Sequence, residues 1–191
     1  MLKYFGMQFH SLTIGQAYFS KGPLNFSFET AGLYFVEGCN GAGKSTLMKT
    51  ILRRLKPLQG RIEGRPQQIA YSGIEGLLFQ DWTVDENIKW ISSLFQQSFT
   101  QDTSLLPSLN PVGSYKIREL SSGWKQLTEV LVALSLPCTV TLLDEPFQAL
   151  DSGHCELVVK AIRSKSKKSL LLLSDHRSLM SASDFKGKVS L

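Results

Sequence analysis

Short apolar runs alternate along this chain with stretches in which apolar residues recur at helical spacing. Residues 33–36, LYFV, form an apolar run typical of a strand. Over residues 44–55, KSTLMKTILRRL, the apolar positions repeat at the three- and four-residue spacing of one helical face. A glycine-rich segment separates the two patterns, and Pro57 and Gly60 are expected to stop the helix. The pattern therefore predicts a strand, a loop and a helix, in that order.

A second helix-start signal lies near the middle of the chain. Thr83 followed by Glu86 is a capping-box pattern, and the apolar residues after it share one face, which predicts a helix over residues 84–95. Short strands are expected before this helix, around the RIE and QIAY segments. Residues 98–114 are polar and contain two prolines, so we expect a loop there.

The second half of the chain continues the alternation. Helical patterns cover residues 126–135 and 155–162, and buried-strand patterns cover residues 138–143 and 169–173. The KVSL segment is expected to add a last strand. Strands that alternate with helices are typical of a largely parallel, doubly wound sheet. The pattern thus predicts the α/β class.

Length and composition favour one globular domain, residues 1–191. Hydrophobic residues make up 42% of the 191 residues, enough for a core. The longest nearly apolar stretch, residues 130–143, contains a proline and falls short of the ~18 residues of a spanning helix. No secretion signal is recognisable at the N-terminus, and three cysteines without metal-ligand spacing fit a reducing compartment, so we expect an intracellular protein. The net charge of +5 is compatible with a phosphate ligand, nucleic acid or an anionic membrane.

Residues 38–45, GCNGAGKS, match the phosphate-loop pattern G-x-x-x-x-G-K-[ST]. Glycines let the backbone wrap a phosphate so that several N–H groups point toward it, and the following helix adds a positive dipole. Lys44 is placed to reach the β- and γ-phosphates, and the Ser45 hydroxyl to ligate Mg²⁺. A glycine turn ahead of a helix is the simpler alternative, but the flanking strand and helix favour the phosphate loop.

Two acids end the apolar strand VTLLDE. Asp144 suits the Mg²⁺ ion beside a bound phosphate. Glu145, one residue later, is placed to polarise an attacking water, as general-base chemistry requires. By itself, a strand that reaches solvent and ends in acids would explain this pattern. The phosphate loop favours the catalytic interpretation.

Residues 120–124, LSSGW, precede a helix, which a Ser/Gly turn would cap. Their place in the chain carries more information, because the phosphate loop is followed in order by LSSGW, LLDEP, ALD and a late His176. This order resembles the ATP-binding cassette (ABC) ATPase family, from about Leu12 to His176. The resemblance implies a P-loop NTPase fold with a largely parallel doubly wound sheet, an antiparallel β edge and a small helical lobe at residues 75–119.

The resemblance also implies ATP and Mg²⁺ as ligands. Ser45 and Asp144 would hold the metal, Glu145 would be catalytic, and His176 would contact the γ-phosphate. Lys44 would serve both binding and catalysis. The phosphate-binding residues implied by the resemblance are Gly38, Asn40, Gly41, Ala42, Gly43, Lys44, Ser45 and Thr46.

Family members bind two ATP molecules between two head-to-tail cassettes. In this chain, Ser121 and Gly123 of LSSGW, the signature segment, would close over the ATP held by a second subunit. Asp151 would belong to the D-loop, which also contributes to the ATP site. A homodimer, or a pair of cassettes, is therefore expected when ATP binds.

The chain departs from the family pattern at several positions. Ile74 stands where the family has the glutamine of its Q-loop. In the signature segment, a serine replaces one glycine and Trp124 replaces a glutamine. The aromatic residue that stacks on adenine is expected at Tyr18, with Phe19 and Gln16 as alternatives.

Within the family, the resemblance favours the ATPase subunit of a membrane transporter. A separate permease would bind the helical lobe, placing this chain on the cytoplasmic face of the inner or plasma membrane; no direct binding of nucleic acid is expected. The short length and the segment LLDEPFQALD resemble the small ATPases of heme export for cytochrome c maturation. The ATPases of lipid, polysaccharide and peptide exporters share many of these features. A soluble assembly ATPase without a permease, like that of iron–sulfur cluster assembly, is the alternative.

Overall fold

A five-stranded parallel sheet forms the centre of the fold. The computed structural model describes residues 6–16, 18–73, 76–95, 103–177 and 179–191. All four strand pairings in this sheet are parallel, and two of its strands, β6 and β7, are buried at every position. The predicted parallel sheet is confirmed. In sheet order, the strands are β5 (Ile69–Ser72), β6 (Val140–Asp144), β7 (Leu170–Ser174), β3 (Gly32–Glu37) and β8 (Phe185–Ser190).

A second, antiparallel sheet confirms the β edge that the family resemblance implies. Its central strand, β1, pairs with β2 on one side and β4 on the other. Buried residues alternate with less buried ones over Met7–Phe9 and again over Leu12–Ile14, on either side of a break in register, as expected for a sheet with one face toward the core. The strands are β1 (Met7–Gln16), β2 (Phe19–Phe28) and β4 (Gln59–Glu63).

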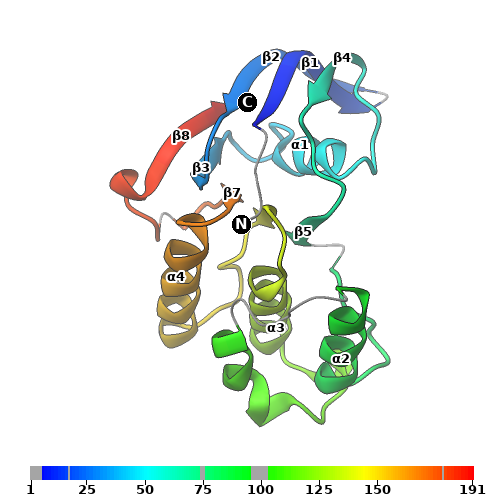
Figure 1. The fold of residues 1–191 in the computed structure, drawn as a ribbon, viewed down its shortest axis with the longest axis vertical. Coiled ribbons are helices and arrows are strands. Elements are labelled where there is room, and N and C mark those ends of the chain that lie inside the picture. Colours follow the sequence, from blue (N-terminus) through cyan, green and yellow to red (C-terminus); the bar gives the residue numbers. More distant parts are fainter. Residues whose placement is uncertain (1–5, 17, 74–75, 96–102, 178) are drawn as a thin grey trace.

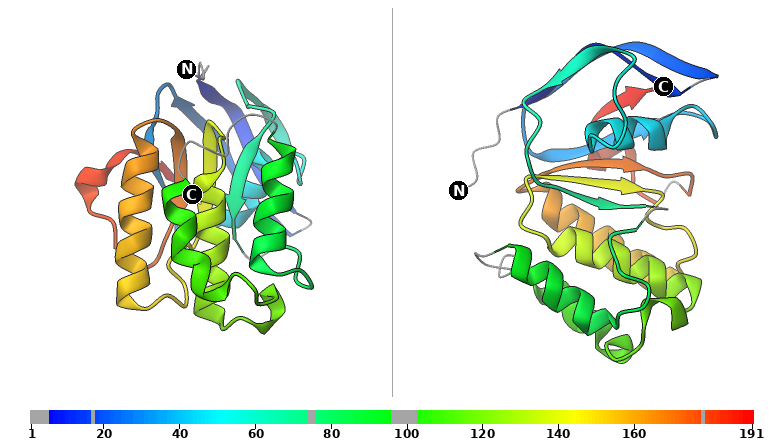
Figure 2. Two further views of the ribbon diagram at one scale, coloured as in Figure 1. Left: turned by 60° about the horizontal axis from the view of Figure 1, so that its bottom comes forward. Right: turned by 90° about the vertical axis from the view of Figure 1, so that its right-hand side faces the viewer.

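Helices cover both faces of the parallel sheet, as the doubly wound class requires. Helix α1 (Lys44–Ile51) lies between the two sheets, and α3 (Ser122–Ser135) and α4 (Ser152–Ser166) pack on the opposite face (Figures 1 and 2). Helix α2 (Val84–Leu94) lies farther out, beyond α3 (Figure 1). One apolar cluster joins the two sheets through α1, and the other joins the parallel sheet to the outer helices.

Short 3₁₀ helices complete the structure at η2 (Thr103–Val112), η3 (Ile117–Glu119) and η4 (Ala182–Asp184). The loop predicted for residues 98–114 is therefore wrong for its described part. Leu109 and Val112 are buried in the outer cluster, so packing stabilises successive 3₁₀ turns despite the prolines. Residues 98–102 lie outside the described part of the chain.

The helix expected over residues 44–55 ends earlier, at Ile51. Arg53 has a φ of 62°, in the left-handed region that a right-handed helix cannot contain. The Arg65 guanidinium donates hydrogen bonds to the carbonyls of Thr50 (2.9 Å) and Ile51 (3.4 Å), so it satisfies acceptors at the helix end. A side chain distant in sequence thus helps to fix this boundary.

The helix boundaries near the site follow local capping. The Thr83 hydroxyl and the Glu86 carboxylate form the expected capping box at the start of α2. Ser121 accepts the N–H of Trp124 and caps α3, as a Ser/Gly turn there predicts. Among the described residues, none of the helices is both long and apolar enough to span a bilayer.

Candidate functional site

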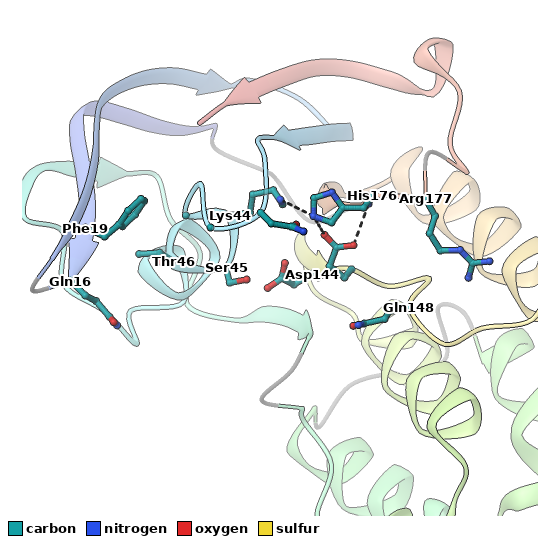
Figure 3. Close-up of a pocket in the computed structure, with 13 residues that line it drawn as sticks. Gln16, Phe19, Lys44, Ser45, Thr46, Asp144, Gln148, His176 and Arg177 are labelled. Atoms are coloured by element: carbon teal, nitrogen blue, oxygen red, sulfur yellow. Dashed lines mark hydrogen bonds and ion pairs between the residues drawn. The ribbon is translucent and has the colours of Figure 1, made fainter.

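A cavity of about 620 Å³ lies where β3, β6 and β7 end. Ligands of open α/β sheets bind at this carboxyl edge, where the loops leave the strands. Figure 3 shows the residues around it, which come from β1, β2, the phosphate loop, and the loops after β6 and β7. They are Gln16, Phe19, Asn40, Gly41, Gly43, Lys44, Ser45, Thr46, Asp144, Glu145, Gln148, His176 and Arg177.

The glycine-rich loop turns sharply between β3 and α1. Gly41 and Gly43 have φ values of 79° and 103°, a left-handed conformation that glycine adopts without a steric penalty. Gly43 is also the N-cap of α1, which therefore begins beside the cavity. Lys44 donates hydrogen bonds to the carbonyls of Gly38 (2.8 Å) and Cys39 (3.2 Å). The loop carbonyls thus hold the Lys44 side chain at the N-terminus of α1.

Asp144 ends β6 with one carboxylate oxygen anchored and the other unpartnered. Ser174, its register partner on β7, donates a 2.6 Å hydrogen bond from its hydroxyl to Asp144 Oδ1. Oδ2 is buried and has no hydrogen-bond partner within the described part of the chain. Asp144 and Ser45 point toward each other across the cavity (Figure 3). A buried, unpartnered carboxylate oxygen facing a hydroxyl suits a Mg²⁺ site.

Glu145 and His176 are in contact at the cavity, and His176 lies on the opposite side from Phe19 (Figure 3). Glu145 Oε1 lies 3.2 Å from His176 Nε2, and Oε2 accepts the His176 backbone N–H at 3.2 Å. Lys44 Nζ lies 3.0 Å from the same Nε2. Because this nitrogen carries either a proton or a lone pair, it can donate to Glu145 or accept from Lys44, but not both at once.

The environment of Glu145 favours a basic carboxylate. Burial raises the pKa of the Glu145 carboxyl, and the nearby His176 and Lys44 oppose this rise. Glu145 is also held at a φ of 54°, which is uncommon for a residue with a side chain and is typical of functional sites.

The structure places two of the three candidates for adenine stacking at the cavity. Phe19 and Gln16 line the cavity, whereas the Tyr18 side chain is fully exposed, at 104% relative accessibility, and is not among the lining residues. Phe19 packs close to the phosphate loop, because a Cβ added to Gly43 would lie 2.8 Å from its ring. The geometry therefore favours the alternative Phe19 over Tyr18.

Other expected site residues do not line the cavity. Gly38 and Ala42 belong to the backbone turn of the phosphate loop. Ser121 and Gly123 lie at the start of α3, and Asp151 is the N-cap of α4. Ile74, at the expected Q-loop position, lies outside the described residues.

Sequence reasoning did not find Ser174, Gln148 or Arg177. Ser174 ends the buried run SLLLLS, just as Asp144 ends VTLLD, and strand pairing places the two side by side. The sequence signal that could have found Ser174 was that both buried strands end in a polar residue. Arg177 donates hydrogen bonds to the carbonyls of Phe147 (2.6 Å) and Leu150 (2.9 Å), so it fixes the turn that follows Glu145.

A parallel sheet, a glycine-rich loop leading from β3 into a helix, and paired acids at the carboxyl end of β6 in the same sheet define a P-loop nucleotide hydrolase. Residues 22–148, more than half of the chain, match the family model described as ABC transporter. The chain belongs to the ABC transporter family, and it is an ATP-binding ATPase domain of that family.

Individual relatives agree with this assignment. The cytochrome c biogenesis ATP-binding export protein CcmA of Wolbachia pipientis wMel is 28% identical over 175 residues, covering 85% of this chain and 84% of that protein. The ribose import ATP-binding protein RbsA of Ruegeria sp. (strain TM1040) is 30% identical over 78% of this chain, but over only 34% of its own length. The fold matches a putative ABC transporter ATP-binding protein from Pyrococcus furiosus with a TM-score of 0.79 and 24% identity, covering 97% of each chain.

Proposed function

We propose that this chain binds and hydrolyses MgATP in the cavity at the carboxyl edge of the sheet, and that hydrolysis powers a membrane transporter. The observation that carries the proposal is the convergence of Lys44, the Asp144–Glu145 pair and His176, from three segments distant in sequence, on one cavity at the phosphate loop. Lys44 would neutralise the terminal phosphates, helped by the N-terminus of α1.

Ser45 and Asp144 would hold Mg²⁺. The buried, unpartnered Oδ2 of Asp144 and the facing hydroxyl are oxygen donors, which this cation prefers. The metal, when bound, would neutralise charge that develops on the phosphate oxygens. Ser174 would keep Asp144 oriented through the 2.6 Å hydrogen bond to Oδ1, leaving Oδ2 free for the metal.

Glu145 would accept a proton from the attacking water. Its raised pKa makes it a stronger base than an exposed glutamate, and its position beside the phosphate loop allows access to a water near the γ-phosphate. His176 would contact the γ-phosphate once ATP binds Lys44. The His176 Nε2 atom, no longer beside the Lys44 ammonium, is then free to donate a hydrogen bond to the phosphate.

We infer that Phe19 stacks on adenine. Its ring lies next to the phosphate loop and lines the cavity, as a base attached to a bound triphosphate requires. Tyr18, fully exposed, would contribute little.

Two such chains would bind ATP between them. Ser121, Gly123 and Asp151 lie at the starts of α3 and α4, outside the cavity of their own chain. From there they are available to the ATP of a second subunit, as the family resemblance implies.

Residues 75–119 are proposed to form a lobe that binds the permease. Phe79, Trp82 and Trp90 form an exposed aromatic cluster there, with the Phe79 ring 4.7 Å and 4.8 Å from the other two ring centroids. Clustered exposed aromatics are typical of protein-binding surfaces. This contact would place the chain on the cytoplasmic face of the membrane.

Heme for cytochrome c maturation is the proposed cargo of that transporter. Support comes from the similarity to the Wolbachia biogenesis export protein over 84% of its length, whereas the ribose import protein is matched over 34%. The cargo itself would be recognised by the permease.

Hydrolysis is tested with two variants. Lys44→Ala is expected to weaken ATP binding, because the phosphates lose their cation. Glu145→Gln is expected to keep MgATP binding and to lose turnover, because an amide cannot act as the base. Equilibrium binding and steady-state phosphate release measure both. Turnover at the wild-type rate in Glu145→Gln would contradict the role of Glu145.

The partner is tested by purification from solubilised native membranes. A tightly bound polytopic membrane protein is the expected result. Recovery of a soluble partner alone would instead support the assembly ATPase. Removal of the exposed rings by Trp82→Ala and Trp90→Ala should release the permease without changing the ATPase rate of the isolated chain.

A further inference from the structure

The first turns of α3 and α4 lie next to each other and are built alike (Figure 1). Ser121 caps α3 by accepting the N–H of Trp124 (3.3 Å), and Asp151 caps α4 by accepting the N–H of His154 (2.9 Å). Trp124 and His154 thus occupy the same position in their helices, three residues after the cap. Their rings meet in an edge-to-face arrangement, with centroids 5.0 Å apart and an interplanar angle of 62°.

His154 makes a second contact on its other side. Its Nδ1 lies 2.8 Å from Asp151 Oδ2, so Asp151 engages both the backbone and the ring of His154. The imidazole therefore bridges two segments of the chain. One is the signature segment, which contains Trp124, and the other is the D-loop, which ends at Asp151.

The backbones of the two segments also approach closely. A Cβ at Gly123 would lie 2.9 Å from the carbonyl oxygen of Ala149, so only glycine permits this spacing. Gln126 Nε2 donates a 3.3 Å hydrogen bond to the carbonyl of Pro146. The signature segment and the first turns of α3 thus contact the turn between β6 and α4 at both of these points.

We propose that Trp124 and His154 are positioning residues that hold the signature segment and the D-loop in one fixed arrangement. The chain of contacts from Trp124 through His154 to Asp151 would present both segments together to the ATP of a second subunit. This inference rests on the proposed pairing of two chains around ATP. It gives the tryptophan, which departs from the family pattern, a definite role.

Two substitutions at His154 separate its two contacts. His154→Asn keeps an N–H donor close to the position of Nδ1 and removes the ring that meets Trp124. His154→Phe keeps a ring and removes the donor to Asp151. Trp124→Ala removes the ring from the other helix, while Trp124→Phe retains a smaller one and serves as the conservative variant.

Each disruption is expected to lower kcat while leaving the KM for MgATP unchanged, because the phosphate loop of the same chain is untouched. The expected loss is ~3- to 10-fold for His154→Asn and Trp124→Ala, the size of one edge-to-face aromatic contact. The double variant should lose no more than either single one, because both remove the same contact. Trp124→Phe should restore most of the rate.

His10→Asn is the matched control. His10 Nε2 lies 3.2 Å from Glu63 Oε2 on the antiparallel sheet, so this change disrupts a histidine–carboxylate pair away from both helices. It should leave kcat unchanged. Urea unfolding of every variant shows whether it stays folded under the assay conditions. Trp124→Ala is expected to lower the midpoint, because the Trp124 ring packs against the outer cluster, and Trp124→Phe is expected to lower it less.

Wild-type kcat in both His154→Asn and Trp124→Ala would overturn the positioning role. Additive losses in the double variant, or an unfolded fraction in the assay large enough to account for the fall in kcat, would also overturn it. In each case Glu145→Gln, which abolishes turnover if the proposed function is right, keeps failure of this inference distinct from failure of that function.

Discussion

Gly76→Ala should destabilise the protein through one buried carboxylate. A Cβ at Gly76 would lie 2.2 Å from Oε1 of Glu129, on α3. That carboxylate cannot simply move away, because it accepts the backbone N–H of Leu77 at 2.8 Å and of Leu78 at 3.4 Å. The alanine therefore displaces a group that anchors the segment after β5 to α3.

The magnitude follows from these hydrogen bonds. The contact to Leu77 is short, and a hydrogen bond to a charged group contributes about 1.5–3 kcal/mol; the longer contact to Leu78 adds little. We therefore expect Gly76→Ala to lower the free energy of unfolding by about 2 kcal/mol. In a chain of 191 residues this corresponds to a fall in Tm of roughly 4–8 °C.

Urea unfolding of a double-mutant cycle measures the effect. Glu129→Ala alone should cost about as much as Gly76→Ala, because it removes the same anchor. Adding Gly76→Ala to Glu129→Ala should then cost almost nothing, since no carboxylate remains to collide with. The control is Thr128→Ala, which removes a side-chain hydrogen bond within α3 to the Trp124 carbonyl. Equal costs of Gly76→Ala with and without Glu129 would refute this reasoning.

Further predictions concern pH, adenine, metal and the Q-loop. Burial raises the pKa of the Glu129 carboxyl, so the folded protein keeps this proton at a pH where the unfolded chain has lost it. The free energy of unfolding should therefore fall as pH rises through the raised pKa. Urea unfolding of Glu129→Gln over the same pH range should not show this fall. Phe19→Ala should weaken ATP binding about tenfold, as expected for a lost base stack, and Tyr18→Ala should leave it unchanged by calorimetry. Asp144→Asn should raise the Mg²⁺ concentration that half-saturates phosphate release. Ile74→Gln, which restores the glutamine of the family pattern, should raise the steady-state rate of the isolated chain. If Glu75 substitutes for that glutamine, Ile74→Gln should be nearly silent and Glu75→Ala should lower the rate; an unchanged rate and Mg²⁺ dependence in both variants would place the Q-loop elsewhere.

The sequence predicted the parts of the fold in which local pattern and burial coincide. The apolar runs before Asp144 and Ser174 are buried strands of the parallel sheet, and the phosphate-loop pattern lies between β3 and α1 as expected. These features could be predicted because a strand buried on both faces has a continuous apolar run. The antiparallel sheet was implied by the family resemblance alone.

The remainder depended on contacts distant in sequence. Phe19 and Tyr18 are adjacent, and which of them faces the cavity depends on strand geometry that composition does not reveal. The end of α1 at Ile51 depends on Arg65, which lies fourteen residues further along the chain. Residues 103–112 contain prolines and were expected to be irregular, but their leucines pack into the outer core.

The exposed aromatic cluster of Phe79, Trp82 and Trp90 has a consequence for the chain before it binds the proposed permease. Adjacent aromatic rings in water favour self-association, and newly made subunits would expose them until assembly covers them. Unassembled copies should therefore be the ones that chaperones retain and proteases remove. The cellular amount of this ATPase would then follow the amount of its membrane partner.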